Sequence, residues 1–149
     1  MLSLRRILVP TDFSPASDRA LAVAIQLARG QSAEILVLHV QERAVDHYGF
    51  GGSVEVLAMQ ERTQAIIDAQ LQAAATKVAA LKLGVRLYHR RGDAWDEIVK
   101  LAREGEVDLI ALSTHGRSSL GEELLGSTTE RVVRKAPCSV LVVRPPAGG

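Results

Sequence analysis

Two patterns of hydrophobic residues alternate along this chain. Short apolar runs predict strands, several of them buried on both faces, while stretches with an apolar residue every three or four positions predict amphipathic helices. The expected strands cover residues 5–10, 34–40, 85–91, 107–112 and 138–143. A helical stretch lies between each pair, which gives the order β-α-β-α-β-α-β-α-β. This order predicts a single α/β domain with a mostly parallel sheet, right-handed crossovers and helices on both faces.

Capping residues mark the expected ends of the helices. Ser14 precedes Pro15 at the start of the first helix, and Ser53 and Asp93 stand before the second and third. Three glycines should end these helices, and they are Gly30, Gly84 and Gly105. The residues expected to face the core are Ala16, Ala20, Val23 and Leu27 in the first helix, Ile67, Leu71, Ala74, Val78 and Leu81 in the second, and Trp95, Ile98, Val99 and Ala102 in the third.

A Gly- and Ser-rich loop, residues 113–126, joins the fourth strand to a short helix that ends before Pro137. Glycines let backbone N–H groups approach a ligand, and a helix N-terminus favours an anion. The loop therefore predicts a phosphate site. It is not a Walker loop, because Glu122 follows Gly121 where that motif needs a lysine. The dinucleotide pattern G-x-G-x-x-G is also absent from the loop.

What remains is Ser113-Thr114-His115-Gly116, then nine residues, then Gly126-Ser127. This pattern resembles the nucleotide signature of the universal stress protein family, G-x-x-G, nine residues, G-[ST], with Ser113 in place of the first glycine. The resemblance runs from ILVPTD at residues 7–12 to PCSVLVV at residues 137–143. It implies an open five-stranded Rossmann-like sheet, similar to adenine-nucleotide α-hydrolases, with strand order 3-2-1-4-5. Residues 1–144 would form the domain and residues 145–149 a flexible tail.

The resemblance also implies a ligand, ATP or another adenine nucleotide such as ADP or AMP, with any Mg²⁺ held through its phosphates. Asp12 would approach the ribose or adenine, and the backbone of Val40 would recognise adenine. Pro10 and Leu112 would form part of the pocket wall around the base and ribose. Arg117 would either reach a phosphate or remain in solvent. The other expected contacts are Thr11, Ser113, His115, Gly116, Gly126, Ser127, Thr128 and Thr129.

Fast catalysis is not expected from this sequence. The loop has no phosphate-binding lysine, and the chain shows no acidic metal pair or recognisable water-positioning residue. His39, His47 and His89 lack metal-ligand spacing. We therefore predict no catalytic or metal-binding residue and at most slow ATP hydrolysis. Two alternatives remain: a dimerising module that binds no nucleotide, which Ser113 favours, and an enzyme of the α-hydrolase type.

Charge and composition limit the kinds of partner that the chain is expected to bind. The net charge is +1, and no basic run suggests nucleic acid. No apolar run approaches the ~18 residues of a membrane span. The single cysteine, Cys138, is expected to be buried in a strand, which suits a reducing cytoplasm. The strand from Cys138 to Val143 is apolar and should form an edge of the sheet. Such an edge invites pairing with a second copy, and the family resemblance implies a homodimer of this kind.

Overall fold

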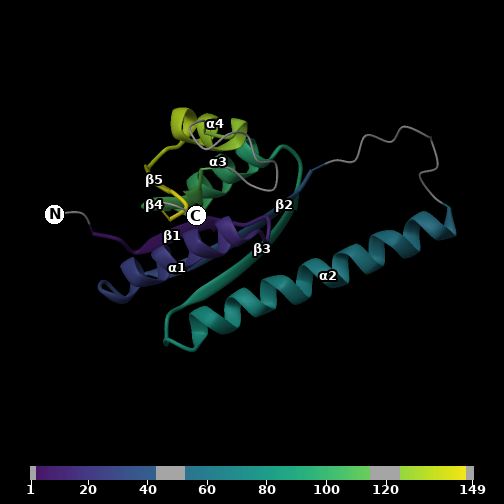
Figure 1. Cartoon of the computed structure of the whole chain (residues 1–149), viewed down its shortest axis with the longest axis horizontal. Coiled ribbons are helices and arrows are strands. Elements are labelled where there is room, and N and C mark those ends of the chain that lie inside the picture. The colour runs from purple at the N-terminus through teal and green to yellow at the C-terminus, as the bar shows by residue number, and fades with distance from the viewer. Residues whose placement is uncertain (1–2, 43–52, 115–124, 147–149) are drawn as a thin grey trace.

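The computed structural model describes residues 3–42, 53–114 and 125–146, which form one α/β unit (Figure 1). Its parallel sheet has the order β3-β2-β1-β4-β5, so the predicted fold class and strand order are confirmed. The strands are β1 (Arg6–Pro10), β2 (Glu34–Gln41), β3 (Val85–Arg91), β4 (Leu109–Ser113) and β5 (Ser139–Val143). The predicted strands differ from these by at most two residues at an end.

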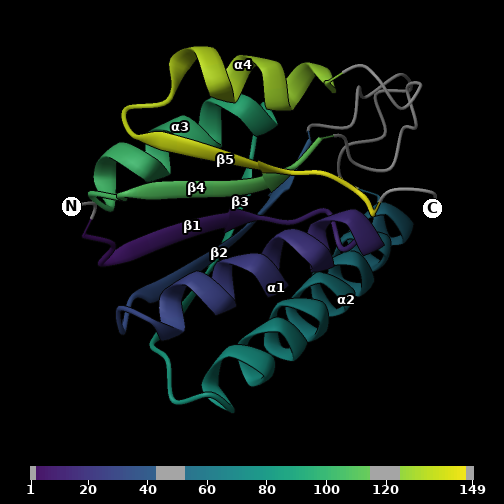
Figure 2. The same cartoon turned by 60° about the vertical axis from the view of Figure 1, so that its left-hand side comes forward.

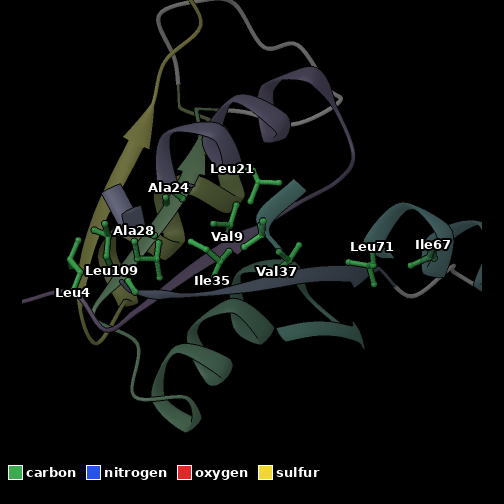
Figure 3. Packing of buried hydrophobic residues seen from close by; sticks show 14 residues of the cluster. Leu4, Val9, Leu21, Ala24, Ala28, Ile35, Val37, Ile67, Leu71 and Leu109 are labelled. Atoms are coloured by element: carbon green, nitrogen blue, oxygen red, sulfur yellow. The ribbon is translucent and has the colours of Figure 1, made fainter. Parts of the chain in front are cut away.

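Helices cover both faces of the sheet (Figure 2). They are α1 (Pro15–Arg29), α2 (Val54–Ala79), α3 (Ala94–Glu104) and α4 (Ser127–Lys135). Successive strand residues point to opposite faces, so each central strand supplies two cores. On β1, Ile7 and Val9 pack toward α1 and α2, whereas Leu8 packs toward α3 and α4. Figure 3 shows the first of these cores, with side chains from β1, β2 and β4 meeting those of α1 and α2.

Strand order reverses between β1 and β4. The chain first builds β2 and β3 on one side of β1, and then crosses to place β4 and β5 on the other side. Ile7 lies opposite Leu109, and Leu8 lies opposite Ile110. In a sheet of this kind, ligands bind beyond the carboxyl ends of the strands at such a reversal.

The predicted core face of α1 was wrong. Ala20 is buried as expected, but Ala16 and Val23 are only half-buried and Leu27 is 36% exposed. Apart from Leu21, the buried side chains of α1 are small, which lets the helix backbone come close to the strands. The buried positions of α1 are Ser17, Ala20, Leu21, Ala24 and Ala28.

The second helix also ends earlier than predicted. It stops at Ala79 rather than at Gly84, and Leu81 lies beyond it with 40% exposure. Lys82 supplies the left-handed backbone of the turn, with φ 58°. Cys138 precedes β5 and is half-buried, and burial raises the pKa of its thiol. The caps at Ser14 and Ser53 form as predicted, whereas Asp93 stands at the start of α3 without a side-chain cap bond.

Few side chains attach α2 to the sheet. Only Ile67, Leu71 and Val78 of this helix are buried. We expect Leu71→Ala to lower the free energy of unfolding by about 2–5 kcal/mol, because it leaves a cavity in the core. Ile66 is 60% exposed, so the matched change Ile66→Ala should cost no more than about 0.5 kcal/mol. Urea unfolding of both variants tests this, and equal losses would contradict the described packing of α2.

Candidate functional site

A cavity of about 390 Å³ lies at the carboxyl ends of β1, β2 and β4. The first residues of α1, α3 and α4 complete its walls, so the site is at the reversal of strand order. Its lining residues are Pro10, Thr11, Asp12, Ser17, Leu38, Val40, Glu42, Ala94, Ile98, Leu112, Ser113, Thr128 and Thr129.

Most of the predicted site residues meet in this cavity although they come from three distant segments. Those that line it are Pro10, Thr11, Asp12, Val40, Leu112, Ser113, Thr128 and Thr129. Gly126 and Ser127 begin α4 next to this wall but do not line the cavity. His115, Gly116 and Arg117 lie outside the described residues.

Sequence reasoning missed part of the lining. Leu38 stands two residues before Val40 and therefore on the same face of β2, so strand alternation was a signal for it. Ala94 and Ile98, one turn apart at the start of α3, reach the cavity through the packing of that helix against the sheet. Ser17 and Glu42 had no sequence signal of this kind.

The turn between β1 and α1 is held by its own side chains. The Oδ1 atom of Asp12 accepts from the Ser14 N–H at 3.0 Å and from the Ser17 hydroxyl at 2.5 Å. The Asp12 N–H donates to the Ser17 Oγ at 3.2 Å. Phe13 adopts φ 63°, an unusual conformation for a large side chain, and its N–H donates to the Thr11 Oγ1 at 3.0 Å. Asp12 is thus both a turn residue and part of the cavity wall.

His39 ties this turn to β2. Its Nδ1 lies 2.8 Å from the Thr11 carbonyl oxygen, and because a carbonyl only accepts, the ring nitrogen must donate. The imidazole also stacks on Phe13, with ring centres 4.6 Å apart. Thr11 in turn donates its N–H to the Leu38 carbonyl at 2.8 Å. These contacts fix the wall of the cavity before any ligand arrives.

Two hydrogen bonds join the end of β4 to the start of α4. The Gly126 N–H donates to the Thr114 carbonyl at 2.7 Å, and the Thr129 hydroxyl donates to the Ser113 carbonyl at 2.8 Å. Gly126 has φ −61° and ψ 156°, a backbone that any residue adopts, so the signature does not need glycine here for its conformation. The first turn of α4 brings Thr128 and Thr129 to the cavity with the positive end of the helix dipole.

The charge of the described wall is negative. Asp12 and Glu42 line the cavity, and within the described residues no lysine or arginine does. Over the same residues, no three His, Cys, Asp or Glu side chains gather as a metal site. Across residues 3–42, 53–114 and 125–146, no helix has the length and apolar character that a membrane crossing requires.

The fold and the cavity define an α/β protein with an open crevice at the reversal of strand order. The model of the universal stress protein family matches residues 3–144. A universal stress protein of Methanothermobacter thermautotrophicus is 35% identical over 142 residues, which cover 94% of this chain and 95% of that protein. The chain belongs to the universal stress protein family, as the sequence resemblance predicted.

Solved structures agree with this assignment. The structure of MJ0577, a universal stress protein of Methanocaldococcus jannaschii, has a TM-score of 0.84 and 28% identity, and the match covers 97% of this chain and 99% of that one. A universal stress protein solved in complex with cAMP has a TM-score of 0.72 and 25% identity, with 95% and 98% covered.

His89 of β3 forms a hydrogen bond with α2. Gln64 of α2 places its Nε2 2.9 Å from the His89 Nδ1 and 2.8 Å from the Asp68 Oδ1. Because an amide nitrogen donates, the His89 Nδ1 accepts, and this contact requires the neutral ring. Burial lowers the pKa of His89, and His39 and Arg91 lower it further, while Asp68 opposes them.

The protein should therefore lose stability as the pH falls below about 6.5, the ordinary imidazole value. With the folded pKa lowered, the unfolded state binds the proton first, so the contribution is complete above about 6.5 and is lost as the pH drops toward the folded pKa. Denaturant midpoints for wild type and His89→Gln at pH values of about 7.5 and 5.5 measure this. His89→Gln should show the smaller loss, and an equal loss in both proteins would rule out His89 as its source.

Proposed function

We propose that this protein binds an adenine nucleotide, ATP, ADP or AMP, in the cavity at the carboxyl ends of β1, β2 and β4. The observation that carries the proposal is the meeting, in one cavity, of residues that the family resemblance nominated from three distant parts of the chain. The relative solved with cAMP supports an adenine ligand by similarity.

The backbone of Val40 suits recognition of the base. The Leu38 carbonyl accepts from the Thr11 N–H, so the main-chain groups of Leu38 point toward β1. Residues two apart in a parallel strand point their main-chain groups the same way, so those of Val40 also face that side. The pairing of β1 with β2 ends where Pro10 lies opposite Leu38, two residues before Val40. The N–H and C=O of Val40 therefore point into the region of the cavity.

The rest of the wall divides into an apolar and a polar part. Leu38, Ile98 and Leu112 offer apolar contact to a base, and Asp12 offers an acceptor to ribose hydroxyls. The phosphates would lie toward the first turn of α4, whose N–H groups and dipole favour an anion. Because Asp12 and Glu42 would repel a triphosphate, ATP would bind with Mg²⁺ held by its phosphates and water. The role that follows is a cytoplasmic regulatory or stress-response protein with little or slow hydrolysis.

Replacement of Gly126 tests this site. Gly126 is buried, and its φ and ψ suit a valine, so Gly126→Val should keep the local backbone conformation while its side chain fills the space that the phosphates need at the first turn of α4. Losing one or two charge-assisted hydrogen bonds costs ~1.5–3 kcal/mol each, at least about tenfold in affinity. Equilibrium binding of labelled ATP measures the loss, with thermal unfolding as the check on folding.

Gly30→Val is the matched control. Gly30 ends α1 with φ −69°, and a Cβ there would meet its nearest neighbour at 3.8 Å, an ordinary contact. This variant should bind ATP as wild type does. If Gly126→Val is folded and also binds like wild type, the phosphates do not lie at α4.

We also propose that the protein forms a homodimer through β5. This strand is at the edge of the sheet, and β4 is its only neighbour in the described sheet. Its residues Val140–Val143 are only partly buried although all four are apolar. Antiparallel pairing with the β5 of a second copy, across a two-fold axis, would bury this edge in a closed assembly.

Proline substitutions in β5 test the dimer. Adjacent residues of a strand point their N–H groups to opposite sides, so one of Leu141→Pro and Val142→Pro removes a donor from the outer edge. That variant should shift toward monomer in light scattering while circular dichroism shows an intact fold. The other should damage the pairing with β4. A wild type that is monomeric at micromolar concentration would refute the dimer, and two folded dimeric variants would place the interface elsewhere.

A further inference from the structure

Glu42 lines the cavity of the proposed nucleotide site, although it lies outside the nucleotide signature. It directly follows β2, and its side chain is exposed. Within residues 3–42, 53–114 and 125–146, its carboxylate forms no hydrogen bond or ion pair. We propose that this carboxylate accepts a hydrogen bond from the exocyclic amino group of the base, so that Glu42 selects adenine over purines that carry a carbonyl in its place. This inference rests on the proposed nucleotide function.

The direction of the main chain at the end of β2 brings this part of the strand to the ligand. The Gln41 carbonyl accepts from the Gly92 N–H at 3.1 Å, so the main-chain groups of Gln41 point toward β3. Successive strand residues point these groups to opposite sides, so those of Val40 point away from β3 and toward the crevice. The bond from the Thr11 N–H to the Leu38 carbonyl gives the same direction from the β1 side.

The side chain of Glu42 lies on the same side of the sheet as the cavity. Leu38, Val40 and Glu42 are two residues apart, and side chains at this spacing share one face of a strand. All three line the cavity. Glu42 is about 6.5 Å further along the chain than Val40, since a strand rises about 3.3 Å per residue. A base held by the Val40 main chain therefore lies within reach of the Glu42 carboxylate.

The two sides of the cavity differ in chemistry. On the α4 side, Thr128 and Thr129 belong to a helix start, where N–H groups favour phosphate. On the other side of β1, the cavity is lined by Glu42 after β2 and by Ala94 and Ile98 of α3. The Glu42 carboxylate thus lies on the side where the base is expected and away from the helix that would hold the phosphates.

Adenine offers donors that match these acceptors. Its exocyclic amino group has two N–H bonds, and the neighbouring ring nitrogen is an acceptor. The Val40 N–H and C=O suit the ring nitrogen and one amino N–H, which leaves the second amino N–H for Glu42. An ionised carboxylate only accepts, and a hydrogen bond to it is stronger than one between neutral groups. Hypoxanthine and guanine place a carbonyl oxygen there instead, and two acceptors repel each other.

Equilibrium binding of AMP and IMP to nucleotide-free protein tests this assignment, because IMP has a carbonyl where AMP has the amino group. Wild type should prefer AMP, and Glu42→Ala should reduce that preference about fivefold or more. The Val40 main chain contributes to the preference in both proteins, so the change between them isolates the contact with Glu42. Glu42→Gln should also reduce the preference, because its amide can donate to the carbonyl of IMP.

Glu61→Ala is the matched control. Glu61 is an exposed carboxylate of α2 that does not line the cavity, so its removal should change the preference less than about twofold. Purine riboside monophosphate, which has only a hydrogen atom in place of the amino group, separates attraction from repulsion. Its affinity for wild type should lie between those of AMP and IMP, and an affinity equal to that of AMP would overturn the hydrogen bond to Glu42.

The remaining outcomes separate this assignment from the nucleotide function. If AMP binds and its preference over IMP is the same in wild type and Glu42→Ala, the assignment fails and the nucleotide function stands. The same conclusion holds if Glu42→Ala weakens AMP and IMP by the same factor, because Glu42 then contacts a part that both ligands share. If neither nucleotide binds to wild type, the nucleotide function fails and the assignment of Glu42 fails with it.

Discussion

The parallel pairing of β1 with β4 is the constraint on which the rest of this structure depends. At the amino ends of these strands, several hydrogen bonds hold the two segments together. The Asp108 carboxylate accepts from the N–H groups of Arg5 and Arg6, at 2.8 and 3.0 Å, and the Asp108 N–H donates to the Arg6 carbonyl. The Arg6 guanidinium donates to the Gly105 carbonyl at the end of α3. At the other ends of these strands the chain turns into α1 on one face of the sheet and into α4 on the opposite face, and that divergence creates the crevice.

The walls of the crevice owe their shape to short-range hydrogen bonds. Asp12, Ser14 and Ser17 bond to one another across one helical turn, and Thr129 closes the junction of β4 with α4. These groups are largely satisfied by the protein itself, so a ligand meets a site whose conformation has already been fixed. Preorganisation of this kind reduces the ordering cost of binding.

Much of this architecture could be predicted from the sequence, because local rules control it. The spacing of hydrophobic residues predicted the strands and helices. Ser14 and Ser53 marked the starts of two helices, because each side chain accepts a hydrogen bond from a backbone N–H three residues later. The errors came where tertiary contact decides. Leu27 has the more apolar side chain, yet α1 presents Ala24 and Ala28 to the sheet because close approach of the backbone outweighs side-chain size. Glu42 and Ile98 join the cavity through the placement of whole elements, which no local pattern encodes.

The uneven attachment of α2 has a consequence for exchange of its amide protons. Val54, Leu57 and Met59, in its first two turns, are largely exposed, while the buried anchors Ile67, Leu71 and Val78 all lie in the later half of the helix. The free energy of local opening should therefore rise along α2 from its first turn toward Leu71, since few buried contacts oppose fraying before Ile67.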